Sequence, residues 1–263
     1  MKSQAIILSI TNPKKFFGLV KYLYSKGMNF IIEIDNSNNT ISFICSKNDA
    51  SIQMLHTFEL RDMIHFISGD INFKNLSFSI DFGVKPNKLL DYLIRDTQEC
   101  ILTLQQVNPS QANVIKLHSS DRIMDFDFDE DINSIQNIKP LYDRLKLLPT
   151  KKEKTLLEFA LPSYILKKNL NNPKKNLWLY LLNKINGQTI LFSDNNYNLQ
   201  ILGEFSTTEN EFAVLLHTGH LKYLENEEYH VKVYPKYILF ISKVKDSKFY
   251  FSITNHYEET THE

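Results

Sequence analysis

Short segments rich in β-branched and aromatic residues recur along the chain, separated by clusters of Asn, Asp, Ser, Gly or Pro. This pattern is typical of β-strands bounded by turns. The predicted strands span, in chain order, residues 29–35, 40–46, 51–60, 71–82, 100–107, 112–120, 122–129, 155–161, 176–185, 188–194, 198–206, 211–217, 228–234, 237–244 and 248–257. The turn formers over residues 35–39 predict a hairpin between the first two strands, and Asn186-Gly187 predicts another.

Two segments of the first half have helical periodicity. Asn12 is a suitable N-cap, Pro13 favours the first helical turn and Gly27 favours a stop, which together predict a helix over residues 13–26. A second helix is predicted over residues 86–96. The apolar stripes of the two helices are Phe16, Leu19, Val20 and Leu23 in the first, and Leu89, Leu90, Leu93 and Ile94 in the second.

The second half of the chain repeats the order of elements found in the first half, with helical segments predicted over residues 162–170 and 218–224. Between the halves lies a charged segment with spaced apolar residues, which indicates an extended connector. We therefore predict an α+β fold of two similar β-rich subdomains, with mostly antiparallel sheets and two short helices each. The first subdomain spans residues 1–130, the connector 131–154 and the second subdomain 155–263.

The composition is that of a folded protein, because 43% of the 263 residues are hydrophobic and 23% are charged. Cys45 and Cys100 are the only cysteines, too few for a disulfide framework or a thiolate zinc site. The N-terminus does not read as a signal peptide, and no run of about 18 apolar residues occurs. We expect a soluble protein in a reducing compartment, without membrane contact.

Positive charge gathers on the predicted helices, although 30 basic and 30 acidic residues leave the whole chain neutral. The basic residues expected to face DNA are Lys14, Lys15, Lys21, Lys26, Lys85, Lys88, Arg95, Lys167, Lys168, Lys174, Lys175 and Lys222. If the helices share one face, lysines on long stems suit non-specific contact with phosphates of double-stranded DNA. The alternative is an ordinary solvated face of amphipathic helices in a lysine-rich chain.

Two segments resemble the proliferating cell nuclear antigen family and the T4-type phage clamps. Met124-Asp125-Phe126-Asp127-Phe128-Asp129 lies directly before the connector, as an alternating acidic strand does in that family. The end of the chain, LENEEYHVKVY (224–234) and FYFSI (249–253), resembles the closing elements of the phage-type clamps. The order of elements extends this resemblance over nearly the whole chain.

The resemblance implies a DNA polymerase processivity factor that is not an enzyme and needs no cofactor or metal. Subunits would close head-to-tail into a ring, a homotrimer, with the helices lining the hole. The ring would encircle duplex DNA and tether DNA polymerase and other replication proteins, and a clamp loader would place it on DNA. The chain departs from the cellular members in having only seven glycines and a second half poor in small residues, which indicates a divergent viral or phage version. We then expect it in the host cytoplasm or nucleoid, or in the nucleus for a nuclear-replicating source.

The resemblance also implies a pocket beneath the connector, into which partners insert a short apolar motif. By position, its residues would be Ile44, Cys45, Ile132, Ile135, Ile138, Pro235, Tyr250, Phe251 and Ile253. The alternative for each of them is ordinary packing in the core or in a sheet.

Three other features suggest different chemistry less strongly. Asp125, Asp127, Asp129 and Asp131 alternate on one strand face, which favours an acidic sheet edge over a metal site because the glycine and distal glutamate of a calcium loop are missing. His217 and His220 lack a third ligand. Trp178 and the aromatic strands favour core packing over base stacking.

Two alternative functions remain open at this point. The first is a viral replication or transcription accessory factor of the same fold that does not encircle DNA. The second is a β-rich virion or scaffold protein, which has no need for helices rich in lysine. No nucleophile elbow, phosphate-binding loop or dinucleotide fingerprint occurs, and seven glycines leave little room for such loops, so we do not expect an enzyme.

Overall fold

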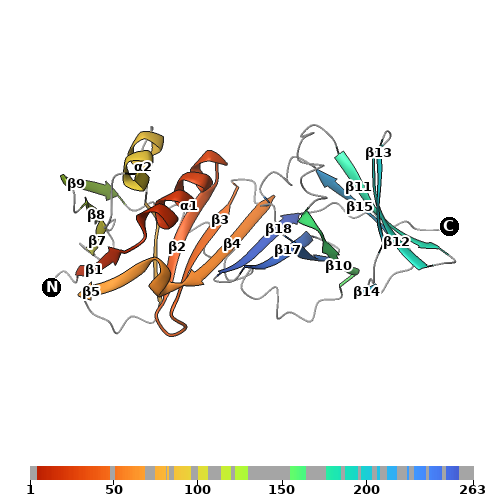
Figure 1. Cartoon of the computed structure of the whole chain (residues 1–263), viewed down its shortest axis with the longest axis horizontal. Helices are drawn as coiled ribbons and strands as arrows, with labels where there is room; N and C mark the ends of the chain where they lie inside the picture. Colours follow the sequence, from red (N-terminus) through yellow and green to blue (C-terminus); the bar gives the residue numbers. More distant parts are fainter. Residues whose placement is uncertain are drawn as a thin grey trace. The chain divides into compact units, whose positions relative to one another are not determined.

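The computed structural model describes eighteen segments of the chain, which are residues 5–47, 51–68, 75–80, 82, 86–95, 100–105, 114–119, 122–129, 155–163, 176–184, 187–194, 197–202, 206–207, 212–217, 224, 228–234, 237–244 and 247–254. The chain divides into two compact units (Figure 1). Unit 1 is built mainly from Met1–Asn48 and Leu55–Arg144, and unit 2 mainly from Leu145–Val244 and Lys248–Glu263.

Unit 1 combines β-strands with two α-helices and one short 3-10 helix. Its described elements are β1 (Ala5–Ile10), α1 (Pro13–Ser25), β2 (Asn29–Asp35), β3 (Thr40–Ser46), β4 (Ile52–Glu59), η1 (Leu60–Asp62), β5 (Ile64–Ser68), β6 (Asn75–Phe78), α2 (Pro86–Arg95), β7 (Cys100–Gln105), β8 (Val114–Ser119) and β9 (Arg122–Asp129). Both α-helices occur where the sequence predicts them, within one residue at each end.

Unit 2 is described as strands. They are β10 (Leu157–Leu161), β11 (Asn176–Lys184), β12 (Gly187–Asp194), β13 (Tyr197–Leu202), β14 (Ser206–Thr207), β15 (Phe212–His217), β16 (Tyr229–Val233), β17 (Tyr237–Val244) and β18 (Ser247–Thr254). The two helices predicted over residues 162–170 and 218–224 fall largely outside the described residues, as does the predicted connector over 131–154.

The two units have the same strand topology. Within unit 1, hydrogen-bonded neighbours follow the orders β5-β1-β7-β8-β9 and β4-β3-β2-β6. Within unit 2 they follow β14-β10-β16-β17-β18 and β13-β12-β11-β15, so that adding nine to each strand number of unit 1 reproduces unit 2. The pairings with a described register are antiparallel, as in β2–β3 and β11–β12. The predicted α+β fold of two similar β-rich subdomains is therefore confirmed.

The predicted turn over residues 35–39 is confirmed, and its own side chains build it. The backbone N–H of Asn38 donates to Asp35 Oδ1 at 3.0 Å, and the Asn38 side-chain amide donates to Asp35 Oδ2 at 2.7 Å. Asn39 has a φ of 53°, in the left-handed region that asparagine tolerates well. This turn sets the β2–β3 register in which Asp35 faces Thr40. The second predicted hairpin joins β11 and β12, with Lys184 opposite Gly187.

Two strands of unit 1 are absent from the sequence prediction. β1 lies between β5 and β7, and Leu8, Ser9 and Ile10 along it are all at most 2% exposed. A strand buried on both faces reads as a short apolar run without alternation, which periodicity alone does not identify. β5 was missed because it is short and follows η1, whose first residue Leu60 was assigned to the strand predicted over residues 51–60.

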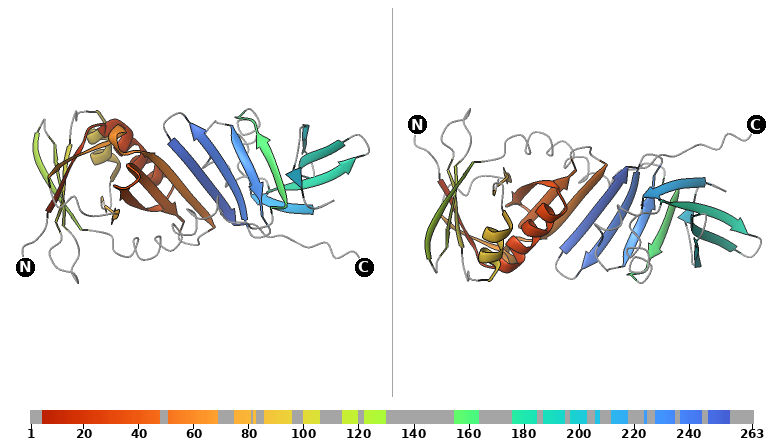
Figure 2. Two further views of the ribbon diagram at one scale, coloured as in Figure 1. Left: turned by 90° about the horizontal axis from the view of Figure 1, so that it is seen from below. Right: turned by 90° about the horizontal axis from the view of Figure 1, so that it is seen from above.

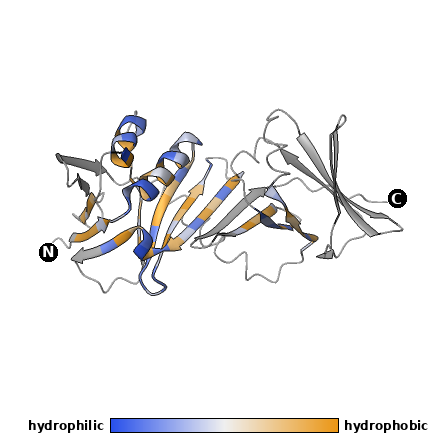
Figure 3. Ribbon diagram, viewed as in Figure 1, coloured by the Kyte–Doolittle hydropathy of each residue, from blue (hydrophilic) through white to orange (hydrophobic). Residues whose placement is uncertain are grey.

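The core of unit 1 lies between α1 and the sheet that contains β2, β3 and β4. Phe16 and Phe43 pack edge to face with ring centroids 5.4 Å apart, and Tyr24 packs on Phe30 at 5.5 Å. In Figure 3 both helices alternate between hydrophilic and hydrophobic segments, whereas β2 and β3 are largely hydrophobic. Of the predicted α1 stripe, Phe16, Val20 and Leu23 are buried, but Phe17 takes the fully buried place expected for Leu19.

Candidate nucleic-acid interface

The local sequence determines which face of α1 is exposed. Asn12 accepts a hydrogen bond from the backbone N–H of Lys15 at 3.1 Å, so the helix begins at Pro13 as predicted. At the other end, Gly27 adopts a φ of 62°, where a side chain would be strained, and ends the helix. Because the buried stripe of α1 packs on the sheet, the opposite face is available to solvent.

The exposed face of α1 is basic and carries no acidic residue. Lys14, Gly18, Lys21 and Ser25 are spaced four, three and four residues apart, so they follow one line along the helix. Lys14 is exposed and forms no ion pair with any residue that the structure describes. A Cβ atom added at Gly18 would meet no atom within 4 Å, so the surface between Lys14 and Lys21 is open. A phosphate backbone can therefore approach this line closely.

Lys15 is directed toward the end of β4 instead of along this line. Its Nζ lies 3.5 Å from Asp62 Oδ2 in η1 and 4.8 Å from the centroid of the Phe58 ring. The Phe58 ring in turn lies 4.2 Å from the ring of His56. This arrangement gives Lys15 a role in covering the core as well as any role at DNA.

His56 is largely buried, and burial, with the nearby Lys15 ammonium adding to the effect, lowers the pKa of His56 to about 4. In the unfolded chain the same imidazole takes up its proton near pH 6.5. Between these two values the unfolded state binds more protons than the folded state. The contribution of His56 to the free energy of unfolding is therefore fully present above about pH 6.5 and is lost as the pH falls toward 4.

We expect the His56→Gln variant to lose less stability than the wild-type protein when the pH falls from 7 to 4.5. The difference should be roughly 2 kcal/mol, since one pH unit in the window corresponds to 1.36 kcal/mol. Urea denaturation at the two pH values measures it. His65→Gln is the control, because His65 is an exposed residue of the neighbouring β5. Equal acid sensitivity of wild type and His56→Gln would contradict the assignment.

An ion pair joins the two helices of unit 1, which lie side by side (Figure 2). Lys21 Nζ of α1 lies 2.5 Å from Asp91 Oδ1 of α2. Both side chains keep about a third of their surface exposed, 35% for Lys21 and 39% for Asp91. The hydrogen bond from Lys21 is the main cause that holds the pKa of Asp91 below its usual range, with the charges of Lys21 and Arg95 contributing.

The other predicted basic residues are only partly described. Lys88 and Arg95 are exposed on α2, and Lys26 caps the end of α1 with its Nζ 5.3 Å from the Tyr22 ring centroid. The remaining predictions lie outside the described residues: Lys85, Lys167, Lys168, Lys174, Lys175 and Lys222. In unit 1 the structure thus brings Lys14, Lys21, Lys88 and Arg95 onto two adjacent helices.

The predicted partner pocket is described at a few positions. Ile44 and Cys45 of β3 are buried, and burial raises the pKa of the Cys45 thiol. Cys45 is the register partner of Phe30, which packs on α1, so Cys45 belongs to the helix-facing core and Ile44 to the opposite face. Tyr250, Phe251 and Ile253 lie on β18. Four predictions fall outside the described residues, namely Ile132, Ile135, Ile138 and Pro235.

The described residues of the acidic alternation, and His217 of the histidine pair, lie on strands. Asp125, Asp127 and Asp129 belong to β9, the last strand in the order β5-β1-β7-β8-β9 of unit 1. Asp131 lies outside the described residues. His118 and Lys116 of β8 are the register partners of Asp125 and Asp127. His217 ends β15 opposite Asn176, within the strand predicted over residues 211–217, and His220 lies outside the described residues.

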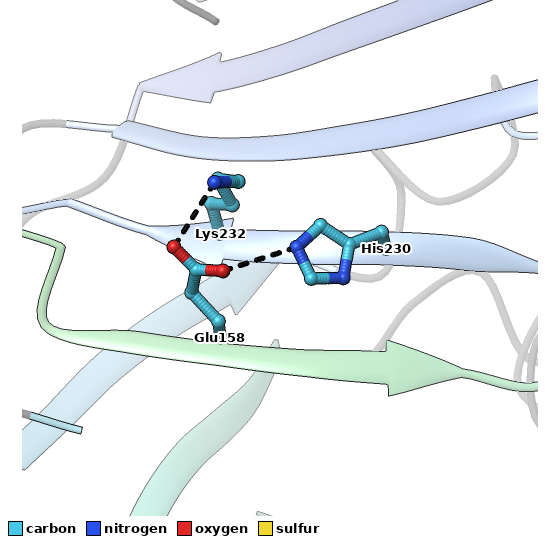
Figure 4. A network of polar contacts seen from close by, with 3 residues as sticks. All are labelled: Glu158, His230 and Lys232. Carbon is cyan, nitrogen blue, oxygen red and sulfur yellow. Dashed lines mark hydrogen bonds and ion pairs between the residues drawn. The ribbon is translucent and has the colours of Figure 1, made fainter. Parts of the chain in front are cut away.

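Sequence patterns do not reveal a polar network in unit 2. Glu158 of β10 accepts from Lys232 Nζ at 3.0 Å and lies 3.2 Å from His230 Nε2, both on β16 (Figure 4). Partial burial acts to raise the pKa of Glu158, but the hydrogen bonds and charges of Lys232 and His230 outweigh it and lower that pKa. The register, with Glu158 opposite Lys232, brings together residues more than seventy positions apart.

Within the part of the chain that the structure describes, no group of three His, Cys, Asp or Glu side chains is placed to hold a metal ion. No helix in that part is long and apolar enough to cross a membrane.

The described residues thus form two β-rich units of one strand topology, with helices packed on the sheet in unit 1, and this fold is shared with the DNA sliding clamps. Solved structures with this fold include the proliferating cell nuclear antigen (PCNA) of Thermococcus kodakaraensis, with a TM-score of 0.55 and 11% identity over 95% of this chain and all of that one. The PCNA2–PCNA3 complex of Sulfolobus tokodaii gives 0.57 and 9%, and the antigen of Entamoeba histolytica gives 0.55 and 12%, each over 95% of this chain and 98% of the other. The predicted resemblance to this family is thus confirmed at the level of fold. No protein-family model and no curated protein matches the sequence.

Proposed function

We propose that this chain is a sliding clamp, a non-enzymatic DNA polymerase processivity factor that closes into a ring around duplex DNA. The observation that carries the proposal is the basic, acid-free exposed face of α1, set beside α2 on a chain of which 95% matches clamp structures in fold. The similarity covers 95% of this chain and 98–100% of each clamp structure, so it extends over both units.

A ring explains how such a surface holds DNA. Lysine contacts with phosphates are individually weak and depend on salt, so two short helices of one chain cannot retain DNA for long. A closed ring that encircles the duplex dissociates only when it opens or slides off an end. It also raises the local concentration of a bound polymerase at the primer end. One of the similar structures is itself a complex of two clamp proteins, PCNA2 and PCNA3.

The first test of the proposal is the solution mass, measured by light scattering over a concentration series. We expect a species of about three times the 30.8 kDa chain, because a homotrimeric ring is the assembly proposed. The second measurement is retention on nicked circular DNA after loading, compared with the same DNA linearised. A ring should be retained on the circle and lost from the linear form, whereas a protein that binds without encircling DNA should be lost equally from both.

The outcomes separate the alternatives. A strict monomer at tens of micromolar, with equal loss from circular and linear DNA, would favour the accessory factor that does not encircle DNA. A chain without salt-dependent DNA binding would favour the virion or scaffold protein. Partners of the proposed clamp are double-stranded DNA, DNA polymerase and a clamp loader. Their apolar motifs would dock at the pocket that the resemblance implies beneath the connector.

A further inference from the structure

We propose that the Asp91 carboxylate weakens the binding of DNA phosphates by the basic face of unit 1, so that replacing this carboxylate increases the affinity for DNA. The inference rests on the proposed function, because it concerns the same helices. Its basis is the ion pair in which Asp91 of α2 holds the Lys21 ammonium of α1, at 2.5 Å.

Lys21 occupies the same line of α1 as Lys14, but the two lysines differ in their surroundings. Lys14 is exposed and has no ion partner among the described residues, whereas Lys21 has a full negative charge within hydrogen-bonding distance. A phosphate that approaches Lys21 must therefore compete with the Asp91 carboxylate for the same ammonium. The same carboxylate also interacts with Arg95, one turn further along α2.

Among the described acidic residues of unit 1, Asp91 is the one that lies on an α-helix. It is the only acidic residue within α2, and α1 has none. By contrast, Asp62 pairs with Lys15 at η1, and Glu59 at the end of β4 pairs with Arg61. Asp91 is thus the one carboxylate on the two helices that repels an approaching phosphate at close range while it neutralises a neighbouring cation.

The segments predicted as helices in unit 2, residues 162–170 and 218–224, contain no Asp or Glu in the sequence. Residues 162–193, which carry Lys167, Lys168, Lys174 and Lys175, contain no Asp or Glu. A clamp that slides needs contacts that are weak and easily exchanged, and a carboxylate that competes with phosphate for one lysine provides this. Asp91 thus lowers the affinity for double-stranded DNA, which keeps the bound clamp mobile along the duplex.

The experiment compares the full-length wild type with Asp91→Asn, which keeps the size of the side chain and removes its charge. Binding to a short fluorescent duplex is measured by anisotropy over a range of NaCl concentrations. We expect roughly tenfold tighter binding at 50 mM salt and a steeper salt dependence, by about one counterion per subunit, because one more lysine becomes available to phosphate. Thermal unfolding of the variant verifies that it is folded.

Glu59→Gln is the matched control, since it makes the same change in net charge at the end of β4, where the ion partner is Arg61 and not a residue of α1 or α2. Lys21→Met completes a double-mutant cycle: it should cost little in the wild-type background and should remove most of the gain in the Asp91→Asn background. This dependence on Lys21 is a readout that a merely structural role of Asp91 would not produce.

Three results would overturn the inference. They are unchanged binding by Asp91→Asn, an equal gain in Glu59→Gln, or weaker binding, which would mean that Asp91 positions Lys21 for DNA. Each of them requires that the wild-type protein binds duplex DNA in a salt-dependent way. If the wild type does not bind at all, the proposed function fails as well, so the two failures are distinguishable.

Discussion

The quadruple variant Lys14→Glu, Lys88→Glu, Lys167→Glu and Lys168→Glu is expected to be lost from nicked circular DNA while its solution mass stays unchanged. Lys14 and Lys88 are exposed on α1 and α2. The structure does not describe Lys167 and Lys168, which we propose for the equivalent face of unit 2. Lys15 and Lys21 stay in place because Lys15 covers Phe58 and Lys21 pairs with Asp91.

The physical basis of this expectation is counterion release. Each lysine that contacts a phosphate releases about one counterion and so steepens the salt dependence of binding. The variant should therefore release up to roughly four fewer counterions per subunit, which makes its salt dependence shallower. Glutamate also repels phosphate at close range. The measurement is the half-life on the nicked circle, together with the slope of affinity against salt on a short duplex.

A control variant separates the helical face from net charge. Lys139, Lys151, Lys152 and Lys154 all lie in the predicted connector or at its end, and changing these four to Glu alters the net charge by the same amount. The control should be retained on DNA nearly as well as the wild type. If both variants are lost equally, or if the helix variant is retained normally, the assignment of the basic face is wrong.

Phe43→Ala is expected to destabilise unit 1 by about 3 to 5 kcal/mol, the usual cost of removing a buried phenylalanine. Phe43 is fully buried on β3, and its ring packs edge to face with Phe16 at 5.4 Å and with Phe58 at 6.3 Å. Alanine would leave a cavity between α1 and the sheet and remove both aromatic contacts. Phe43→Leu is the conservative control and should cost markedly less.

The chain offers a way to assign this loss to unit 1. Trp178, the only tryptophan, is on β11 of unit 2, so its fluorescence reports on that unit, whereas far-UV circular dichroism reports on both. In Phe43→Ala, the midpoint of the dichroism transition should fall by roughly 10 °C. An unchanged dichroism midpoint would contradict the central place of Phe43 in the core. A fluorescence midpoint that falls equally would show that the two units unfold together.

Several elements of unit 1 were predictable because their signals are local. Asn12, Pro13 and Gly27 define the start and the end of α1 through their own backbone preferences, and the structure places them in those roles. The turn over residues 35–39 was predictable for the same reason, since Asp35 and Asn38 bond to each other. Strand prediction from the sequence failed for β1, because a strand buried on both faces shows no alternation of apolar and polar residues. It also failed for β5, because only the single turn η1 separates β5 from β4.

The candidate interface also combines features that local sequence predicts with features that depend on distant segments. The basic face of α1 follows from helical spacing, so the sequence suffices to place Lys14 and Lys21 on one line. Which lysine is available could not be predicted, because the partners of Lys21 and Lys15 come from α2 and η1, 70 and 47 positions away in the sequence. Similarly, the register of β10 and β16 decides that Glu158 meets Lys232.

The sequence by itself determined the ends of α1, the turn over residues 35–39 and the line of Lys14 and Lys21 on α1, since each depends on residues within a few positions of one another. Only the tertiary structure decided that the two units share one strand topology, that Cys45 lies on the sheet face that packs on α1 and that Asp91 pairs with Lys21. These features depend on strand register and on the packing of α2 against α1. Both are set by contacts between distant segments, which the pattern of a single chain does not record.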